Sequence, residues 1–119
     1  KGYGRIINMA PLAGQNGGTA TGAHYAATKG AIVTLTKIFA KEFAAKGVTV
    51  NAVAPGPMES PIVHSVVPDE KMEQFIQNIP VKALGSMHFI AETCGLLASP
   101  NAGFVTGATW DINGGLFMR

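Results

Sequence analysis

The chain has 119 residues, of which 47% are hydrophobic and 13% charged, a composition typical of one globular domain with a packed core. Its net charge is only +2 and its lysines and arginines form no basic run, so we expect no nucleic-acid partner. No apolar run approaches the roughly 20 residues that span a bilayer, so we expect no membrane partner. The single cysteine, Cys94, excludes an intrachain disulfide and fits a reducing, cytoplasmic location.

The first half of the chain changes from a strand pattern to a helix pattern and back. Residues 5–9 are short, β-branched and apolar, which predicts a buried strand. Residues 14–23 are rich in glycine and threonine and predict a loop. Residues 24–45 repeat apolar side chains at spacings of three and four, which predicts a helix that Gly47 ends. Residues 48–54 are apolar almost throughout, a pattern typical of a strand covered on both faces.

The second half continues this alternation. Pro55 to Pro57 ends the second strand, and residues 58–68 predict a loop or a broken helix. Residues 69–79 and 88–98 carry helical patterns, and residues 109–112 predict a last strand. Strands that alternate with helices predict an α/β fold, with a parallel sheet joined by right-handed crossovers.

Tyr25 and Lys29 form the first candidate for chemistry. They are four residues apart at the start of the predicted helix, so their side chains share one face. A free tyrosine has a pKa of about 10, and a neighbouring ammonium favours its phenolate form. Tyr25 could then donate a proton to a nascent alkoxide. The same spacing also occurs in many exposed helix pairs, so the pair needs its surroundings to be informative.

Those surroundings resemble the short-chain dehydrogenase/reductase family over nearly the whole chain. The matching segments, in order, are residues 5–8, 25–31, 50–57, 106–107 and 111–115. The resemblance implies an α/β fold, namely the C-terminal half of a Rossmann-like doubly wound parallel sheet with three strands. Within the family, residues 79–85 and 103–116 look most like acetoacetyl-CoA reductases and 3-oxoacyl-acyl-carrier-protein reductases.

The resemblance also implies an activity and its residues. The chain would reduce a 3-oxoacyl thioester, bound to CoA or to a carrier protein, with hydride from NADPH or NADH, NADPH being favoured. Tyr25 and Lys29 would be catalytic, and both would contact the cofactor. The remaining cofactor contacts would come from Pro55, Gly56, Met58 and Ser60. No metal site is expected, because the three histidines lack partners at ligand spacing.

Two departures from the family pattern bear on activity. The family normally has a substrate-binding serine near the end of its fifth strand, and Pro11 stands there instead. Proline has no hydroxyl and no backbone N–H, so a loop threonine (Thr19 or Thr21) or a water would have to replace the serine, or activity would be impaired. The glycine-rich nucleotide-binding half is also missing, so residues 1–119 are expected to be the C-terminal part of one domain. The alternative function is a catalytically impaired relative or fragment with a structural or subunit role.

The long predicted helix carries a second expectation. Helices at this position pair between subunits in the family, so Ala31, Leu35, Ile38 and Phe39 could face a second subunit in a homodimer or homotetramer. Packing of these side chains on the sheet is the other interpretation.

Overall fold

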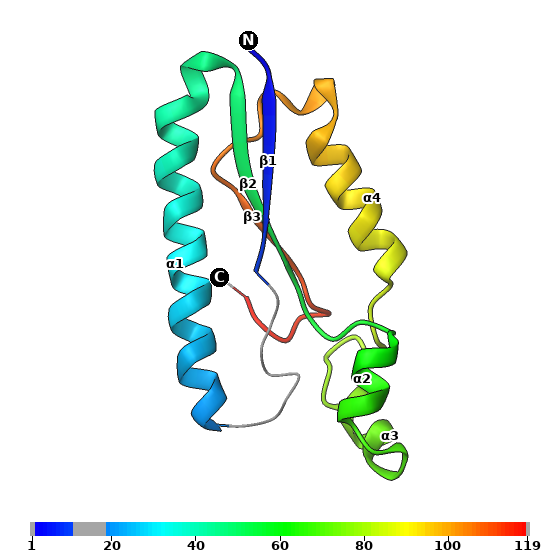
Figure 1. Cartoon of the computed structure of the whole chain (residues 1–119). Helices are drawn as coiled ribbons and strands as arrows, with labels where there is room; N and C mark the ends of the chain where they lie inside the picture. The colour runs from blue at the N-terminus through cyan, green and yellow to red at the C-terminus, as the bar shows by residue number, and fades with distance from the viewer. Residues whose placement is uncertain (1, 11–18, 119) are drawn as a thin grey trace.

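The computed structural model describes residues 2–10 and 19–118, and for residues 19–26 it describes the backbone alone. Three strands form one sheet, with a long helix on one face and a shorter helix on the other (Figure 1). In chain order the elements are β1 (Gly4–Met9), α1 (Thr19–Phe43), β2 (Val48–Pro55), α2 (Pro61–Val66), α3 (Asp69–Gln77), α4 (Met87–Ala98) and β3 (Thr109–Ile112). None of the described helices is both long and apolar enough to cross a membrane.

The sheet is parallel throughout, in the order β1-β2-β3, which confirms the predicted α/β class. Met9 lies opposite Val53, and Pro55 lies opposite Ile112, so the carboxyl ends of the three strands meet at one edge. The central strand β2 is buried along almost its whole length. Within the described residues, β1 and β3 each leave one edge without a neighbouring strand.

Helix α1 begins at Thr19, so the predicted loop over residues 14–23 is wrong for residues 19–23. Glycine and threonine have low intrinsic helix propensity, but a long helix that packs on a sheet overrides such a local preference. The other end of the helix follows the prediction. A short 3₁₀ turn leads to Gly47, whose φ of 80° is the left-handed conformation that glycine adopts without strain.

The two faces of the sheet are packed differently. On the α4 face, Val53, Met58, Ile90 and Leu97 form an apolar core, against which the half-buried Cys94 also packs. On the α1 face, the helix buries Lys29, Thr36 and Ala40, at spacings of seven and four. The large side chains Leu35, Ile38 and Phe39 are at least 40% exposed, so none of them is buried against the sheet. Leu35 and Phe39 instead line an open apolar groove beside Ile6 of β1.

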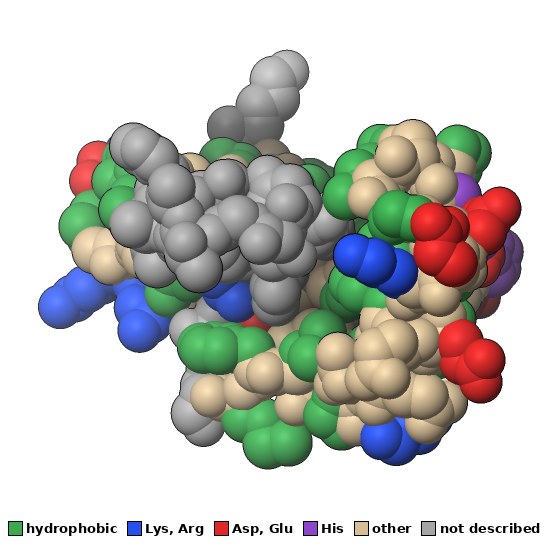
Figure 2. Space-filling model, turned by 90° about the horizontal axis from the view of Figure 1, so that it is seen from below, with side chains coloured by type: hydrophobic (Ala, Val, Ile, Leu, Met, Phe, Trp, Pro, Cys, Tyr) green, Lys and Arg blue, Asp and Glu red, His purple; other side chains and the backbone are tan. Residues whose placement is uncertain are grey.

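Helices α2 and α3 form a separate end of the molecule beyond the carboxyl edge of the sheet (Figure 1). Acidic side chains gather on this side when the molecule is viewed onto that edge (Figure 2). Asp69 and Glu70 lie in the first turn of α3, where the partial positive charge of the helix N-terminus favours carboxylates.

Candidate active site

The carboxyl edge of the sheet holds a pocket of about 200 Å³. In open α/β sheets this edge is where ligands bind. The pocket is lined by Met9, Pro55, Gly56, Met58, Ser60, Ile62, Val63, Met87 and Ile90. Four of the side chains or backbone positions that the sequence predicted for a cofactor therefore lie around one cavity.

Gly56 lies where β2 and β3 end side by side. Its backbone N–H donates a hydrogen bond of 2.8 Å to the carbonyl oxygen of Ile112. A Cβ on Gly56 would lie 2.7 Å from the Cβ of Asn113, closer than carbon atoms pack. The glycine is therefore required by the close approach of the two strands, in addition to any role beside a ligand.

Met58 and Ser60 line the same pocket in different ways. Met58 is only 6% exposed and belongs to the apolar core, and its backbone forms a parallel bridge with Gly85. Ser60 is half-buried and precedes α2 in an extended conformation, and its hydroxyl does not cap that helix. Met58 can thus supply an apolar wall and Ser60 a hydroxyl to a molecule in the pocket.

Lys29 is a nearly buried cation next to this edge. Its side chain is 10% exposed, and its Nζ lies 3.3 Å from Oδ1 of Asp111, whose side chain is 14% exposed. The same Nζ lies 4.4 Å from the centre of the Phe117 ring, within the range of a cation–π contact. Asp111 is opposite Ala54 in the sheet, one residue before Pro55, so the ammonium is close to the strand ends that form the pocket.

Tyr25 lies in α1 four residues before Lys29, so the helix places the two residues on the same face, as predicted. Its side chain and the whole of Pro11 lie outside the described residues. The assignment of Tyr25 as proton donor and the consequence of Pro11 therefore stay predictions.

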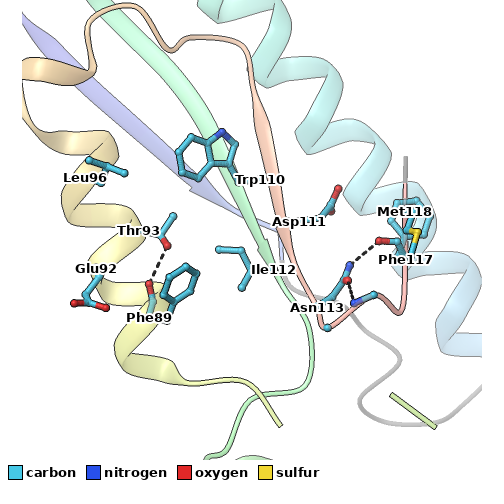
Figure 3. Close-up of a pocket in the computed structure, with 12 residues that line it drawn as sticks. Phe89, Glu92, Thr93, Leu96, Trp110, Asp111, Ile112, Asn113, Phe117 and Met118 are labelled. Atoms are coloured by element: carbon cyan, nitrogen blue, oxygen red, sulfur yellow. Dashed lines mark hydrogen bonds between the residues drawn. The ribbon is translucent and has the colours of Figure 1, made fainter. Parts of the chain in front are cut away.

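Sequence reasoning matched Asp111 only as part of a family segment and gave it no role beside Lys29. One signal was available. Strand alternation places Asp111 on the opposite face from Trp110 and Ile112, so a carboxylate faces the helix that carries Lys29. Figure 3 shows this arrangement, with Trp110 and Ile112 directed toward α4 and Asp111 directed away from them.

A larger pocket of about 770 Å³ lies between α4 and β3 (Figure 3). Its walls are mostly apolar and aromatic, including Phe89, Leu96, Trp110 and Phe117. Among the described side chains, none that the sequence predicted for catalysis or cofactor binding lines this pocket.

Two histidines whose side chains the structure describes, His64 and His88, are exposed. His64 forms a pair of 2.6 Å with Glu59, and His88 forms a pair of 3.5 Å with Glu92 on the surface of α4. Among the described residues, no three His, Cys, Asp or Glu side chains form a group that could hold a metal ion.

Comparison with known proteins extends over almost the whole chain. The model of the family described as Enoyl-(Acyl carrier protein) reductase matches residues 1–117. The chain is 40% identical over 118 residues to 3-oxoacyl-[acyl-carrier-protein] reductase FabG of Haemophilus influenzae, a match that covers 99% of this chain and 48% of the relative. It is 41% identical over 118 residues to acetoacetyl-CoA reductase of Rhizobium meliloti, with the same coverage of 99% and 48%.

A solved structure agrees with these matches. The crystal structure of a short-chain dehydrogenase/reductase, glucose/ribitol dehydrogenase, from Brucella melitensis aligns with a TM-score of 0.79 at 38% identity. The alignment covers 97% of this chain and 46% of that chain. The chain thus spans about half the length of the relatives that it matches. On the sequence and the fold together, this chain belongs to the short-chain dehydrogenase/reductase family of oxidoreductases.

Proposed function

We propose that this chain is the carboxy-terminal half of a reductase that converts a 3-oxoacyl thioester into its 3-hydroxy form. The observation that carries the proposal is the nearly buried ammonium of Lys29, one helical turn after Tyr25. Its partner Asp111 lies opposite Ala54, the residue before Pro55, at the carboxyl end of the sheet. Two similar proteins, named as reductases of 3-oxoacyl-[acyl-carrier-protein] and acetoacetyl-CoA, support the substrate class.

The residues at this edge fit the nicotinamide end of a dinucleotide. The lining offers an apolar wall at Met58 and a hydroxyl at Ser60, and Lys29 offers an ammonium that could bind ribose hydroxyls. When bound, NAD(P)H would supply the hydride that reduces the ketone carbon. We favour NADPH over NADH, and comparison of the two initial rates at equal concentration tests that preference.

The chain's own residues would manage the proton. Tyr25 would donate its phenolic proton to the carbonyl oxygen as that oxygen gains negative charge, which gives the 3-hydroxy product and leaves a phenolate on Tyr25. The ammonium of Lys29 would stabilise this phenolate. In the reverse direction the phenolate would act as the base.

The family binds the rest of the dinucleotide, including its pyrophosphate, with a glycine-rich segment that is not found among residues 1–119. A glycine-rich strand, turn and helix that bind the pyrophosphate would complete the domain. Among the described residues no strand pairs with the outer edge of β1, so an additional parallel strand can add there. Beside this edge lies an apolar groove lined by Ile6, Leu35 and Phe39, among others. We therefore place a nucleotide-binding half on this edge.

Substitution of Tyr25 by phenylalanine tests the proposed function. In the complete protein, Tyr25→Phe should lower the rate of NADPH oxidation with acetoacetyl-CoA by about 10²–10⁴-fold, the usual contribution of a general acid. Tyr3→Phe is the matched control, since the residue Tyr3 is 53% exposed and its hydroxyl donates a hydrogen bond to the carbonyl oxygen of Ala98, away from Lys29 in the sequence and the fold. Equal turnover of wild type and Tyr25→Phe would refute the proposal.

Pro11 favours a second candidate, an impaired relative with a structural or subunit role. A missing hydrogen bond to a developing oxyanion typically costs about 10²–10³-fold in rate. If this candidate is right, the native protein shows no NADPH oxidation with acetoacetyl-CoA, and Pro11→Ser raises turnover. If Pro11→Ser leaves an already active enzyme unchanged, another group replaces the serine.

We also propose a homo-oligomer, either a dimer or a tetramer. The exposed side chain of Ile38 on α1, which does not line the groove beside β1, supports an interface on this helix. The mass of the complete protein in solution, measured by light scattering, tests this proposal.

A further inference from the structure

The Lys29–Asp111 pair differs from the other ion pairs in the described part of the chain. Both of its side chains are nearly buried, whereas the pairs Glu59–His64 and His88–Glu92 are exposed. An ammonium taken out of water is costly unless an opposite charge compensates it. The carboxylate of Asp111 therefore offsets the cost of burying the Lys29 ammonium at this position on α1.

Phe117 bounds the ammonium from another direction. Its ring centre lies 4.4 Å from Nζ of Lys29. The turn after β3 places the ring beside the ammonium. The Asn113 side chain holds this turn, since it donates a hydrogen bond of 3.0 Å to the Phe117 carbonyl oxygen and accepts one of 3.0 Å from the N–H of Gly115 (Figure 3). Asn113 is itself buried, so this turn is anchored in the fold.

These contacts restrict a side chain that is otherwise flexible. A lysine has a four-carbon stem with many rotamers, and its ammonium can point in many directions. Here the Asp111 carboxylate and the Phe117 ring restrict the positions that Nζ of Lys29 can take. The lysine lies on α1, the carboxylate on β3 and the ring in the segment after β3.

We propose that Asp111 is a positioning residue for Lys29. Its carboxylate, together with the Phe117 ring, holds the Lys29 ammonium where it can bind the nicotinamide ribose and support Tyr25. The inference rests on the proposed function. It assigns to Asp111 a role that acts through Lys29 and involves no contact with the reacting atoms.

Asp111→Asn in the complete protein tests this role, because asparagine keeps the size of the side chain and removes its charge. We expect kcat/KM for the nicotinamide cofactor to fall about tenfold, while KM for the thioester stays unchanged. Glu92→Gln is the matched control, since Glu92 is an exposed carboxylate that lines the same large pocket as Asp111. Asp111→Glu, which returns the carboxylate, should recover part of the lost kcat/KM.

A double-mutant cycle separates positioning from a purely structural effect. If Asp111 acts through Lys29, Asp111→Asn causes no further loss of kcat/KM in a Lys29→Met background. The same tenfold loss in both backgrounds would overturn the proposal, as would a fall in thermal stability with kcat/KM unchanged. Should Asp111→Asn fail to fold, Phe117→Leu removes the ring and leaves the charges paired, and we expect a loss of about threefold in the same parameter.

Chemical labelling gives a readout that needs no activity. In the wild type, an amine-reactive acylating reagent should modify Lys29 more slowly than the exposed Lys37, as measured by peptide mass spectrometry. Asp111→Asn should accelerate modification of Lys29 several-fold and leave Lys37 unchanged. An equal Lys29 rate in both proteins would overturn the positioning role. Absence of NADPH oxidation by the wild type would instead refute the proposed function and leave this result interpretable.

Discussion

The two faces of the sheet are covered by helices that pack on them through different kinds of side chain. On the α4 face, large apolar side chains such as Val53, Ile90 and Leu97 form a continuous core. On the α1 face, the contacts include an Asn8–Thr36 hydrogen bond of 3.1 Å and the Lys29–Asp111 ion pair of 3.3 Å. Apolar contacts are non-directional, whereas hydrogen bonds and ion pairs fix atoms in particular places.

This difference suggests a division of roles between the faces. The α4 face holds the cluster of large buried apolar side chains, whose burial stabilises the fold. The α1 face contributes small residues and polar pairs. These set the distance between α1 and the sheet and the rotation of α1 about its own axis. That helix carries Tyr25 and Lys29, so its placement decides where the proposed proton donor lies.

The largest expected effect is on the apolar face. Leu97 is 1% exposed, so Leu97→Ala should lower the free energy of unfolding by about 2–5 kcal/mol through lost burial and a cavity. Denaturant unfolding of the two proteins measures the change. Leu96→Ala, on the same helix but 57% exposed, should change it by less than about 0.5 kcal/mol. Similar losses for the two variants would contradict the assignment of the core to this face.

A smaller effect is expected on the polar face. Thr36→Val preserves the shape of a fully buried side chain but removes the hydroxyl that accepts from Nδ2 of Asn8. The free energy of unfolding should fall by about 1 kcal/mol, because the Asn8 amide loses a partner. Thr34→Val, an exposed substitution on the same helix, is the control. A stabilising Thr36→Val would show that apolar packing could replace this hydrogen bond.

The smallest expected effect is an increase in the free energy of unfolding. Gly95 lies within α4, and a Cβ there would meet no atom within 4 Å. Gly95→Ala should therefore raise the free energy of unfolding by about 0.5–1 kcal/mol, since alanine favours the helix. Gly47→Ala should instead lower it, because the backbone is left-handed and a Cβ would collide with the carbonyl oxygen of Gly2. Thermal unfolding of both variants measures the contrast.

Much of the fold could be predicted from local sequence. The apolar strand at 48–54 and the glycine stop at Gly47 are strong local signals, and both are confirmed. The strand at 5–9 is also present, but the prediction that it is buried is wrong: its residues are half-buried or exposed, because β1 lies at one edge of the described sheet. The start of α1 could not be predicted in the same way. Residues 19–23 have weak helix propensity, and they are helical as the first turns of a long helix that packs on the sheet.

The residues of α1 that are buried against the sheet could not be predicted from the apolar periodicity of the helix. Leu35, Ile38 and Phe39 are large apolar residues of the helix at spacings of three and four, so periodicity offers them as a packing face. The structure buries Thr36 and Ala40 instead. The sheet beneath presents the small, buried Ala52 and Ala54, and such a surface accepts a close approach of small helix residues.

The sequence by itself determined the α/β class, the order of the strands and helices, and the family, because these follow from periodicity, glycine and proline signals, and ordered motifs. Only the tertiary structure decided that Asp111 and Phe117 meet Lys29. These residues are about 80 to 90 positions apart along the chain. No local pattern predicts their contact. It exists because the crossover helix α1 packs on the face of the sheet to which the Asp111 side chain of β3 points.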